Sequence, residues 1–73
     1  MSKVVLYGTR FCPYCTAARY LLSAKGVNYE DIPLDSDMNL RREIMDKSGQ
    51  RTVPQIWIGE RHVGGYSELQ QLE

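Results

Sequence analysis

Residues 3–26, KVVLYGTRFCPYCTAARYLLSAKG, decide the fold, because a strand signal, both cysteines and a helix signal follow one another directly. Residues 3–7 are short, rich in β-branched side chains and followed by Gly-Thr-Arg, which is typical of a buried strand. Residues 17–24 then place alanines and leucines at helical spacing, and a Lys-Gly pair gives the helix a stop. We therefore predict a helix over residues 13–25.

The start of this helix falls inside the motif Cys12-Pro13-Tyr14-Cys15. Proline suits the first helical position, because the N–H that it lacks would have no partner there. Cys12 is then the N-cap, where free N–H groups and the helix dipole favour a thiolate and lower the thiol pKa. Cys15 lies one turn further on, on the same side and among apolar neighbours, so we expect it to keep a higher pKa. We predict that Cys12 attacks and Cys15 resolves.

Two other uses of a close cysteine pair compete with this redox role. A structural disulfide between Cys12 and Cys15 would close a loop too short to stabilise the fold, because the stabilisation grows with the length of chain enclosed. A zinc site needs four ligands, whereas the chain offers two cysteines and His62, which we expect to be structural or solvent-facing. A C-x-x-C motif between a strand and a helix is a redox signal. A redox pair without a metal is therefore the preferred interpretation.

The segments after the first helix continue the alternation of strands and helices. Residues 28–34 predict a second strand, in which Pro33 indicates the edge of a sheet. A strand, a helix and a strand in succession predict two parallel strands joined by a right-handed crossover. Residues 35–49 open on Asp and Ser, repeat apolar positions at helical spacing and close on a glycine, which predicts a second helix.

The last third of the chain predicts a hairpin and a short helix. Residues 52–65 alternate apolar and polar side chains around a turn signal at Gly59-Glu60. Ser67 is followed three residues later by Gln70, an arrangement in which N-cap and N3 side chains satisfy each other's backbone donors. A third helix is expected from Ser67 to the last residue. The predicted order is βαβαββα, an α/β fold.

Length and charge limit the remaining possibilities. The 73 residues suffice for one packed core, so residues 1–73 are expected to form a single domain. Nine basic residues balance nine acidic ones, which argues against a nucleic-acid-binding surface. The chain lacks the run of about 18 apolar residues that a membrane span needs, and its start lacks a signal-peptide pattern. A cytoplasmic location is therefore expected.

Three motifs, in this order and at these spacings, resemble the glutaredoxin family: CPYC at residues 12–15, TVP at 52–54 and GGYSEL at 64–69. The resemblance covers nearly the whole chain. It implies a minimal thioredoxin-like fold with a central four-stranded mixed sheet flanked by helices. It also implies a glutathione-dependent thiol-disulfide oxidoreductase that reduces protein–glutathione mixed disulfides and protein disulfides, with Cys12 and Cys15 as the redox-active disulfide.

The resemblance also implies partners. Glutathione would be the co-substrate, glutathionylated or disulfide-bonded proteins the substrates, and an NADPH-dependent glutathione reductase the indirect source of electrons. We expect a monomer that binds neither nucleic acid nor membrane. The alternative is a carrier in which two subunits and two glutathiones hold a [2Fe–2S] cluster through Cys12. Pro13 and Cys15 argue for the enzyme, because family members that favour clusters often lack one or the other.

The family's binding residues carry over to the matching positions of this chain. Pro13 and Tyr14 shape the active site, and a cis bond before Pro54 is expected to turn the Val53 backbone toward the cysteines. Many relatives have a lysine three residues before the first cysteine, where this chain has Thr9 with Arg10 beside it. The residues expected to bind glutathione are Arg10, Arg51, Thr52, Val53, Pro54, Gly65, Tyr66, Ser67 and Glu68.

Two further expectations concern the remaining residues. Family members usually continue past the final ELQQLE with more helical residues, so this chain is either naturally minimal or shortened. Large apolar side chains outside the motifs are most often buried. We therefore predict core or cleft-lining positions for Tyr7, Phe11, Trp57 and Val63.

Overall fold

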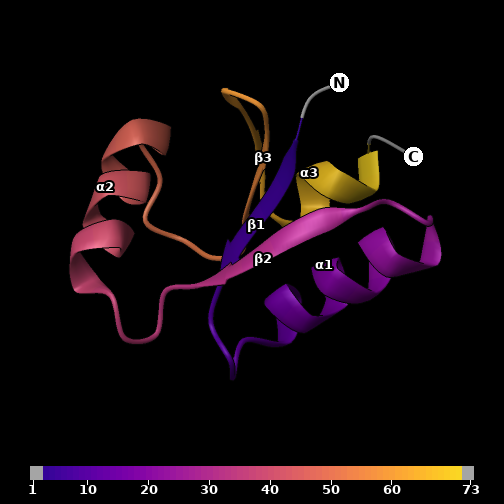
Figure 1. Cartoon of the computed structure of the whole chain (residues 1–73), viewed down its shortest axis with the longest axis horizontal. Helices are drawn as coiled ribbons and strands as arrows, with labels where there is room; N and C mark the ends of the chain where they lie inside the picture. Colours follow the sequence, from indigo (N-terminus) through magenta and orange to yellow (C-terminus); the bar gives the residue numbers. More distant parts are fainter. Residues whose placement is uncertain (1–2, 72–73) are drawn as a thin grey trace.

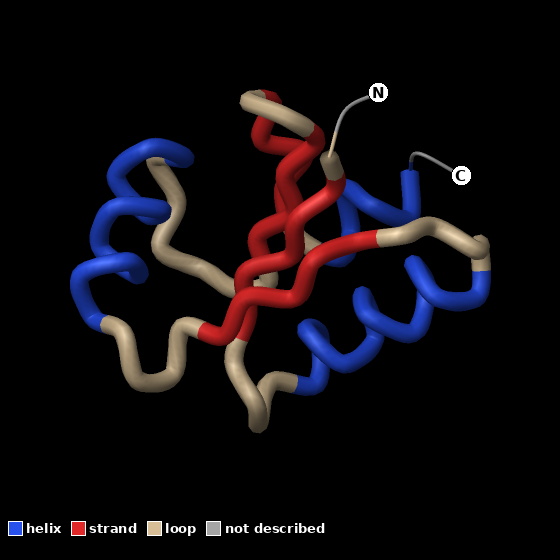
Figure 2. Tube along the Cα trace, viewed as in Figure 1, coloured by secondary structure: helices blue, strands red, loops and turns tan. Residues whose placement is uncertain are grey.

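A computed structural model of the chain describes residues 3–71, and its elements follow the predicted order βαβαββα (Figure 1, Figure 2). They are β1 (Val4–Gly8), α1 (Pro13–Ala24), β2 (Tyr29–Pro33), α2 (Met38–Ser48), β3 (Gln55–Ile58), β4 (Arg61–Gly64) and α3 (Tyr66–Gln71). The predicted segments are confirmed with shifted boundaries, and the end of the predicted third helix, residues 72–73, lies outside the described residues. None of the helices within residues 3–71 is both long and apolar enough to cross a membrane.

The strands of the described chain form one mixed sheet in the order β2-β1-β3-β4. β1 runs parallel to β2 and antiparallel to β3, and β3 and β4 make the predicted hairpin. β2 is an edge strand, which explains why it tolerates Pro33: one side of an edge strand has no ladder to which an N–H must donate. The parallel β1–α1–β2 unit and the mixed sheet are therefore confirmed.

Helices α1 and α3 cover one face of the sheet, and α2 lies on the opposite side (Figure 1). The core between the sheet and helices α1 and α3 contains Leu6, Ala18, Leu22, Ile56 and Leu69. Burial of a leucine or isoleucine side chain contributes about 1.5–3 kcal/mol. This core holds β1 and α1 together, and it thereby fixes the position of the turn that joins them and carries Cys12.

Local signals set the ends of α2. The Asp37 carboxylate accepts a hydrogen bond from the backbone N–H of Leu40 at 3.0 Å, which makes Asp37 the N-cap. At the other end Gly49 has a left-handed conformation, with φ 73°, and donates to the carbonyl of Met45 at 2.9 Å. Glycine adopts this conformation without a steric penalty because it has no Cβ. The predicted helix is confirmed, but it begins after Asp37 and not at residue 35.

The predicted cap of α3 is wrong. The helix begins at Tyr66, and the carbonyl of Gly65 accepts the first helical hydrogen bond, from the N–H of Leu69 at 3.0 Å. The carboxylate of Glu68 accepts the N–H of Gly65 at 2.6 Å. Gly65 is therefore the N-cap, and the acidic side chain three residues later satisfies its donor. Ser67, predicted as the cap, lies within the first turn and is exposed.

The predictions for the large apolar residues are confirmed for three residues and wrong for Phe11. Val63 packs against the core, and Tyr7 and Trp57 line a depression on the α2 side of the sheet. Phe11 stands on the turn between β1 and α1, and 89% of its surface is exposed. The turn carries Phe11 past the end of the sheet, so its side chain does not reach the core. His62 is half-buried and packs on Trp57 with ring centroids 4.9 Å apart, which agrees with a structural role.

Candidate active site around the cysteine pair

Cys12 is the N-cap of α1, as predicted, with φ −103° and ψ 114°. Its Sγ accepts a hydrogen bond from the backbone N–H of Cys15 at 3.3 Å, so the sulfur itself caps the first turn. In the thiol form the same atom donates to the carbonyl oxygen of Val53 over 3.8 Å. Cys12 is half-buried. Its sulfur is therefore held between the first turn of α1 and the loop before β3, in a residue that is still partly exposed to solvent.

The surroundings of Cys12 lower its pKa. Burial alone raises the pKa of this thiol, but hydrogen bonds from the Cys15 thiol and from the backbone N–H groups of Cys15 and Tyr14 outweigh it. The positive charge of Arg19 lowers the pKa further. The net result is a pKa below the ordinary value of a cysteine, as the N-cap position predicts.

Cys15 has the opposite behaviour. It is fully buried on the inner side of α1. Burial and the hydrogen bond between its thiol and Cys12 raise its pKa to about 11, although the N–H of Thr9 acts in the other direction. Both cysteines are free thiols in the structure. Of the two, Cys12 therefore loses its proton more readily, and the predicted asymmetry of the pair agrees with the structure.

Gly8, which the sequence prediction missed, makes room for the buried sulfur. A Cβ atom added at Gly8 would lie 2.9 Å from Cys15 Sγ and 3.2 Å from Cys15 Cβ. Real Cβ atoms do not approach sulfur so closely, so a larger residue would displace Cys15. The available signal was a glycine at the end of a buried strand, which often marks a close approach of another segment.

A groove of about 190 Å³ adjoins Cys12 at the Val53 carbonyl. The Val53–Pro54 peptide bond is cis, which confirms the prediction for this bond. Tyr14 and Tyr66 stand across the groove with ring centroids 6.3 Å apart. The groove is lined by Tyr14, Thr52, Val53, Pro54, Gly65, Tyr66, Ser67 and Glu68. All the residues predicted to bind glutathione, except the two arginines, therefore line one surface.

Gln55 holds the loop that forms one wall of this groove. Only 1% of its surface is exposed. Its side-chain amide donates to the carbonyl of Gln50 at 3.0 Å and to the carbonyl of Thr52 at 3.2 Å. Buried polar groups of this kind are retained when they are hydrogen-bonded. Gln55 thus ties residues 50–52 to the first residue of β3, a role that no sequence signal had indicated.

The two arginines predicted to bind glutathione lie elsewhere. Arg10 lines a different depression, together with Arg19, Asp31, Pro33 and Asp35, and its backbone N–H donates to Asp35 at 3.0 Å. Arg51 is exposed and lines a surface depression formed mainly by α2. The structure thus brings neither guanidinium to the wall of the groove.

Arg19 is a third residue that the sequence prediction missed, after Gly8 and Gln55. Its Nε donates to the Asp31 carboxylate at 2.8 Å, and its Nη2 donates to the carbonyl of Thr9 at 3.2 Å. The side chain is 23% exposed, so the ion pair is partly shielded from water. Arg19 therefore links α1 to β2 and to the turn before Cys12. Only the βαβ topology, not local spacing, brings these three segments together.

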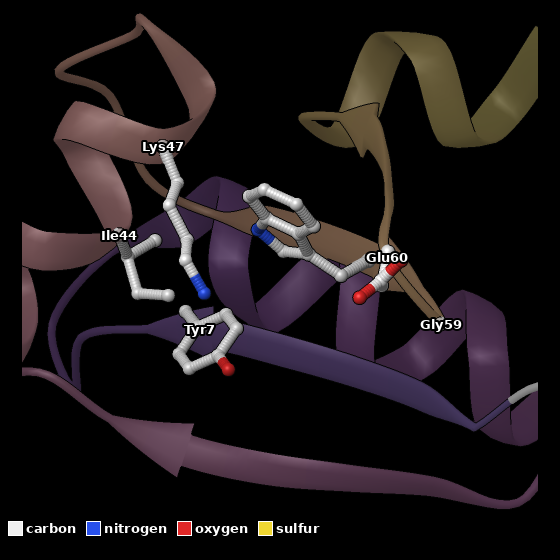
Figure 3. Close-up of a pocket in the computed structure, with 6 residues that line it drawn as sticks. Tyr7, Ile44, Lys47, Gly59 and Glu60 are labelled. Carbon is white, nitrogen blue, oxygen red and sulfur yellow. The ribbon is translucent and has the colours of Figure 1, made fainter.

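The depression on the α2 side of the sheet is a cavity larger than the groove, and it lies away from the cysteines. It has a volume of about 330 Å³ and is lined by Tyr7, Ile44, Lys47, Trp57, Gly59 and Glu60. Figure 3 shows the Lys47 side chain reaching from α2 toward Tyr7 on β1, with Glu60 at the other end of the cavity. Neither cysteine contributes to it, so we place the candidate active site at Cys12 and not here. Within residues 3–71, no group of three or more His, Cys, Asp or Glu side chains is arranged to hold a metal ion.

Comparisons with known proteins agree with this geometry. Residues 4–63 match the glutaredoxin family. A glutaredoxin from Pseudomonas aeruginosa is 52% identical over 73 residues, which span this chain fully and 87% of that protein. The solution structure of glutaredoxin from Brucella melitensis superposes with a TM-score of 0.85 at 42% identity, over 99% of this chain and 78% of that chain. The crystal structure of a buckwheat glutaredoxin–glutathione complex gives a TM-score of 0.88 at 29% identity, over 96% of this chain and 66% of that chain.

The family match and the structure support one another. The matched residues 4–63 include both cysteines, the cis-proline loop, β1 to β3 and all of β4 except its last residue, Gly64. The thioredoxin-like arrangement of strands and helices places a low-pKa Cys12 at the start of α1 and a protonated Cys15 one turn behind it. The chain therefore belongs to the glutaredoxin family of glutathione-dependent thiol-disulfide oxidoreductases.

Proposed function

We propose that the chain reduces protein–glutathione mixed disulfides and protein disulfides, with Cys12 as the nucleophile and Cys15 as the resolving cysteine. One observation carries the proposal: Cys12 Sγ is capped by the Cys15 N–H at 3.3 Å and lies beside the Val53 carbonyl where the groove begins. A thiolate held at this point can attack a disulfide whose glutathione part occupies the groove.

The first reaction needs Cys12 alone. Its thiolate attacks the glutathione sulfur of a mixed disulfide, a Cys12–glutathione bond forms, and the bond between glutathione and the substrate protein breaks. The substrate leaves as a thiolate. A second glutathione thiolate then attacks the bound glutathione sulfur, which releases glutathione disulfide and restores the Cys12 thiolate. The low pKa of Cys12 favours this last step, because a low-pKa sulfur is a good leaving group.

The second reaction uses both cysteines. Cys12 attacks a protein disulfide and forms a mixed disulfide with one of its sulfurs, and the other sulfur leaves as a thiolate. Cys15 then attacks Cys12 Sγ, loses its proton and expels the second substrate thiolate, so that a Cys12–Cys15 disulfide remains. Two glutathione molecules reduce this disulfide. The raised pKa of Cys15 keeps it protonated until the mixed disulfide has formed.

The groove residues are proposed to bind glutathione through backbone and side-chain groups. The Val53 backbone would pair with the cysteine of glutathione like an added strand. Glu68, at the start of α3, offers a carboxylate to the glutathione amino group, and Tyr66 and Ser67 offer backbone N–H groups. Arg51 is exposed and directly precedes Thr52 on the groove wall, so its long side chain can turn from the depression beside α2 to the glycine carboxylate of glutathione. We assign this contact to Arg51 and not to Arg10, which lines the depression around Asp31 and Asp35. Pro13 and Tyr14 would shape the entrance.

The cellular setting follows from the chemistry. Glutathione supplies the electrons, and an NADPH-dependent glutathione reductase would regenerate it from glutathione disulfide. A cytoplasm rich in reduced glutathione is the proposed location, with the chain acting as a monomer. We propose that no metal takes part. A brown protein that absorbs visible light after purification would instead favour the alternative, a dimer that carries a [2Fe–2S] cluster.

The test is a glutathione mixed-disulfide reduction assay on the wild type, Cys12→Ser and Cys15→Ser. We expect Cys12→Ser to lose all activity, because serine supplies no thiolate. Cys15→Ser should keep the reduction of glutathionylated substrates and lose the reduction of protein disulfides. Activity of Cys12→Ser at the wild-type rate would contradict the mechanism, and loss of both activities in a folded Cys15→Ser would contradict the division of roles.

A further inference from the structure

An exposed aromatic pair flanks the nucleophile. Phe11 directly precedes Cys12 and is 89% exposed, and Tyr14 follows it by two residues and is 65% exposed. Single apolar residues on a protein surface are common. These two, however, lie within two residues of the cysteine that substrates must reach. Apolar surface at such a point is covered whenever a substrate binds, and its burial then contributes to binding.

The two aromatic residues face different surroundings. Tyr14 lines the groove that we assign to glutathione, and its ring lies 6.3 Å from that of Tyr66. Phe11 lines neither this groove nor the charged depression around Arg10 and Arg19. A ligand that fills the groove therefore leaves Phe11 uncovered.

The chemistry requires a polypeptide close to Phe11. During disulfide exchange the attacking, central and leaving sulfurs lie nearly in line, so the cysteine of the substrate protein is within a few ångströms of Cys12. Glutathione occupies the groove beside Val53 in the proposed complex. The substrate cysteine then lies beyond the glutathione sulfur and outside the groove, so the chain that carries it covers exposed surface next to Cys12, and Phe11 supplies apolar surface there.

We propose that Phe11 is a specificity-determining residue that packs against an apolar side chain next to the substrate's cysteine. The inference rests on the proposed function. Phenylalanine has no polar group, so the complementary partner is an aliphatic or aromatic side chain and not a charged one. The occupant of this surface is therefore a polypeptide segment of the protein substrate, and a small disulfide gains nothing from Phe11.

Two glutathionylated peptides that differ at one position test this pairing. One carries leucine next to its cysteine and the other carries serine, and a small glutathione mixed disulfide serves as the third substrate. In Phe11→Ala we expect kcat/KM to fall about tenfold for the leucine peptide, since partial burial of a phenylalanine ring contributes roughly that factor. The serine peptide and the small disulfide should be reduced at nearly the wild-type rate. Phe11→Leu should restore most of the activity toward the leucine peptide.

Tyr20→Ala is the matched control, because Tyr20 is also an exposed aromatic residue, at 77%, but lies further along α1. It should leave all three substrates unaffected. An equal loss on all three substrates in Phe11→Ala, or no loss on any, would overturn the inference. A wild-type protein that fails to reduce the small disulfide would contradict the proposed function itself, which is a different result from a changed peptide preference.

Discussion

The lowered pKa of Cys12 has two sources, the first turn of its own helix and a charge that the fold brings close. Burial raises the pKa, and the hydrogen bonds from Cys15 and Tyr14 that outweigh it come from the first turn of α1. These donors could be predicted from the CPYC motif, because a helix that starts at Pro13 leaves its first N–H groups free. The remaining contribution is the charge of Arg19, which the fold supplies.

Replacing Arg19 with glutamine should raise the pKa of Cys12. Without the guanidinium the thiolate loses a nearby positive charge, so a smaller fraction of Cys12 is ionised at any pH below its pKa. The thiolate absorbance in the ultraviolet, followed across a pH titration, measures the change. Alkylation of Cys12 at mildly acid pH should slow in parallel.

Matched variants separate charge from fold. Arg19→Lys keeps the charge and should stay closer to the wild type. Lys3→Gln breaks an exposed ion pair between the residue before β1 and Glu30 of β2, at the end of the strands away from the cysteines, and should leave the titration unchanged. An identical titration curve for Arg19→Gln and the wild type would show that Arg19 has no electrostatic role at Cys12.

Side-chain positions mark the limit of the sequence prediction at this scale. The roles of the two sulfurs, the cis bond before Pro54 and the groove wall could be predicted from motifs, because each motif fixes the backbone of a few consecutive residues. Arg10, Arg51 and Phe11 were assigned from residue type and nearness along the chain. Their directions depend on which segments the fold places beside them, for instance Asp35 beside the N–H of Arg10, and spacing carries no such information.

At the scale of elements, the cap of α3 joins the groove to the stability of the helix. Gly64 has φ 130°, and a Cβ atom there would lie 2.6 Å from Oε1 and 2.7 Å from Cγ of Glu68. The same Oε1 accepts the N–H of Gly65. A side chain at residue 64 would therefore displace the carboxylate that caps α3 and lines the groove.

Gly64→Ala is expected to lower the free energy of unfolding by about 2–4 kcal/mol, since the strain of the backbone conformation adds to the loss of a helix cap. Gly49→Ala is the control: Gly49 also has a positive φ, 73°, but nothing lies within 4 Å of its added Cβ. It should cost only about 1–2 kcal/mol, the penalty of the left-handed conformation. Chemical denaturation measures both. Equal losses would show that the contact with Glu68 does not matter.

The helix caps also show what sequence patterns can and cannot resolve. The caps of α2 at Asp37 and Gly49 could be predicted from the sequence, because each residue forms a hydrogen bond with a backbone group only three or four residues away. For α3 two overlapping patterns were available, Ser67 with Gln70 and Gly65 with Glu68. The charged carboxylate is the stronger acceptor, and β4 ends at Gly64, so the chain enters the helix at Gly65.

At the scale of the molecule, one core positions both halves of the active site. Leu6 and Ile56 pair across β1 and β3, and Ala18 and Leu22 of α1 pack on them. β1 leads into the cysteine turn, and the loop that contains Val53 leads into β3. The order βαβαββα was predictable from periodicity and turn signals, whereas the meeting of the cysteine turn and the Val53 loop follows only from the sheet order β2-β1-β3-β4.

The buried thiol couples the stability of the whole reduced protein to pH. An unfolded cysteine ionises near pH 8.5, whereas folded Cys15 has its pKa raised to about 11 by burial and by Cys12. Between these values the unfolded chain releases a proton that the folded chain retains, so a rise in pH favours unfolding. Cys12 has a lowered pKa in the folded protein and therefore contributes a slope of the opposite sign, which ends once the unfolded thiol, with its pKa near 8.5, is also ionised.

Stability of the reduced wild type should therefore fall by about 3 kcal/mol more than that of Cys15→Ala as the pH rises from about 8.5 to about 11. Tyrosines and lysines titrate in the same range, but they are common to both proteins, so the difference between the two curves isolates Cys15. Cys15→Ala also leaves a small cavity, which lowers the free energy of unfolding by the same amount at every pH and so does not change how that free energy depends on pH. Urea denaturation at several pH values under reducing conditions gives both curves. Parallel curves would mean that Cys15 ionises as easily in the folded protein as in the unfolded chain, and the assignment of a protonated resolving cysteine would then be wrong.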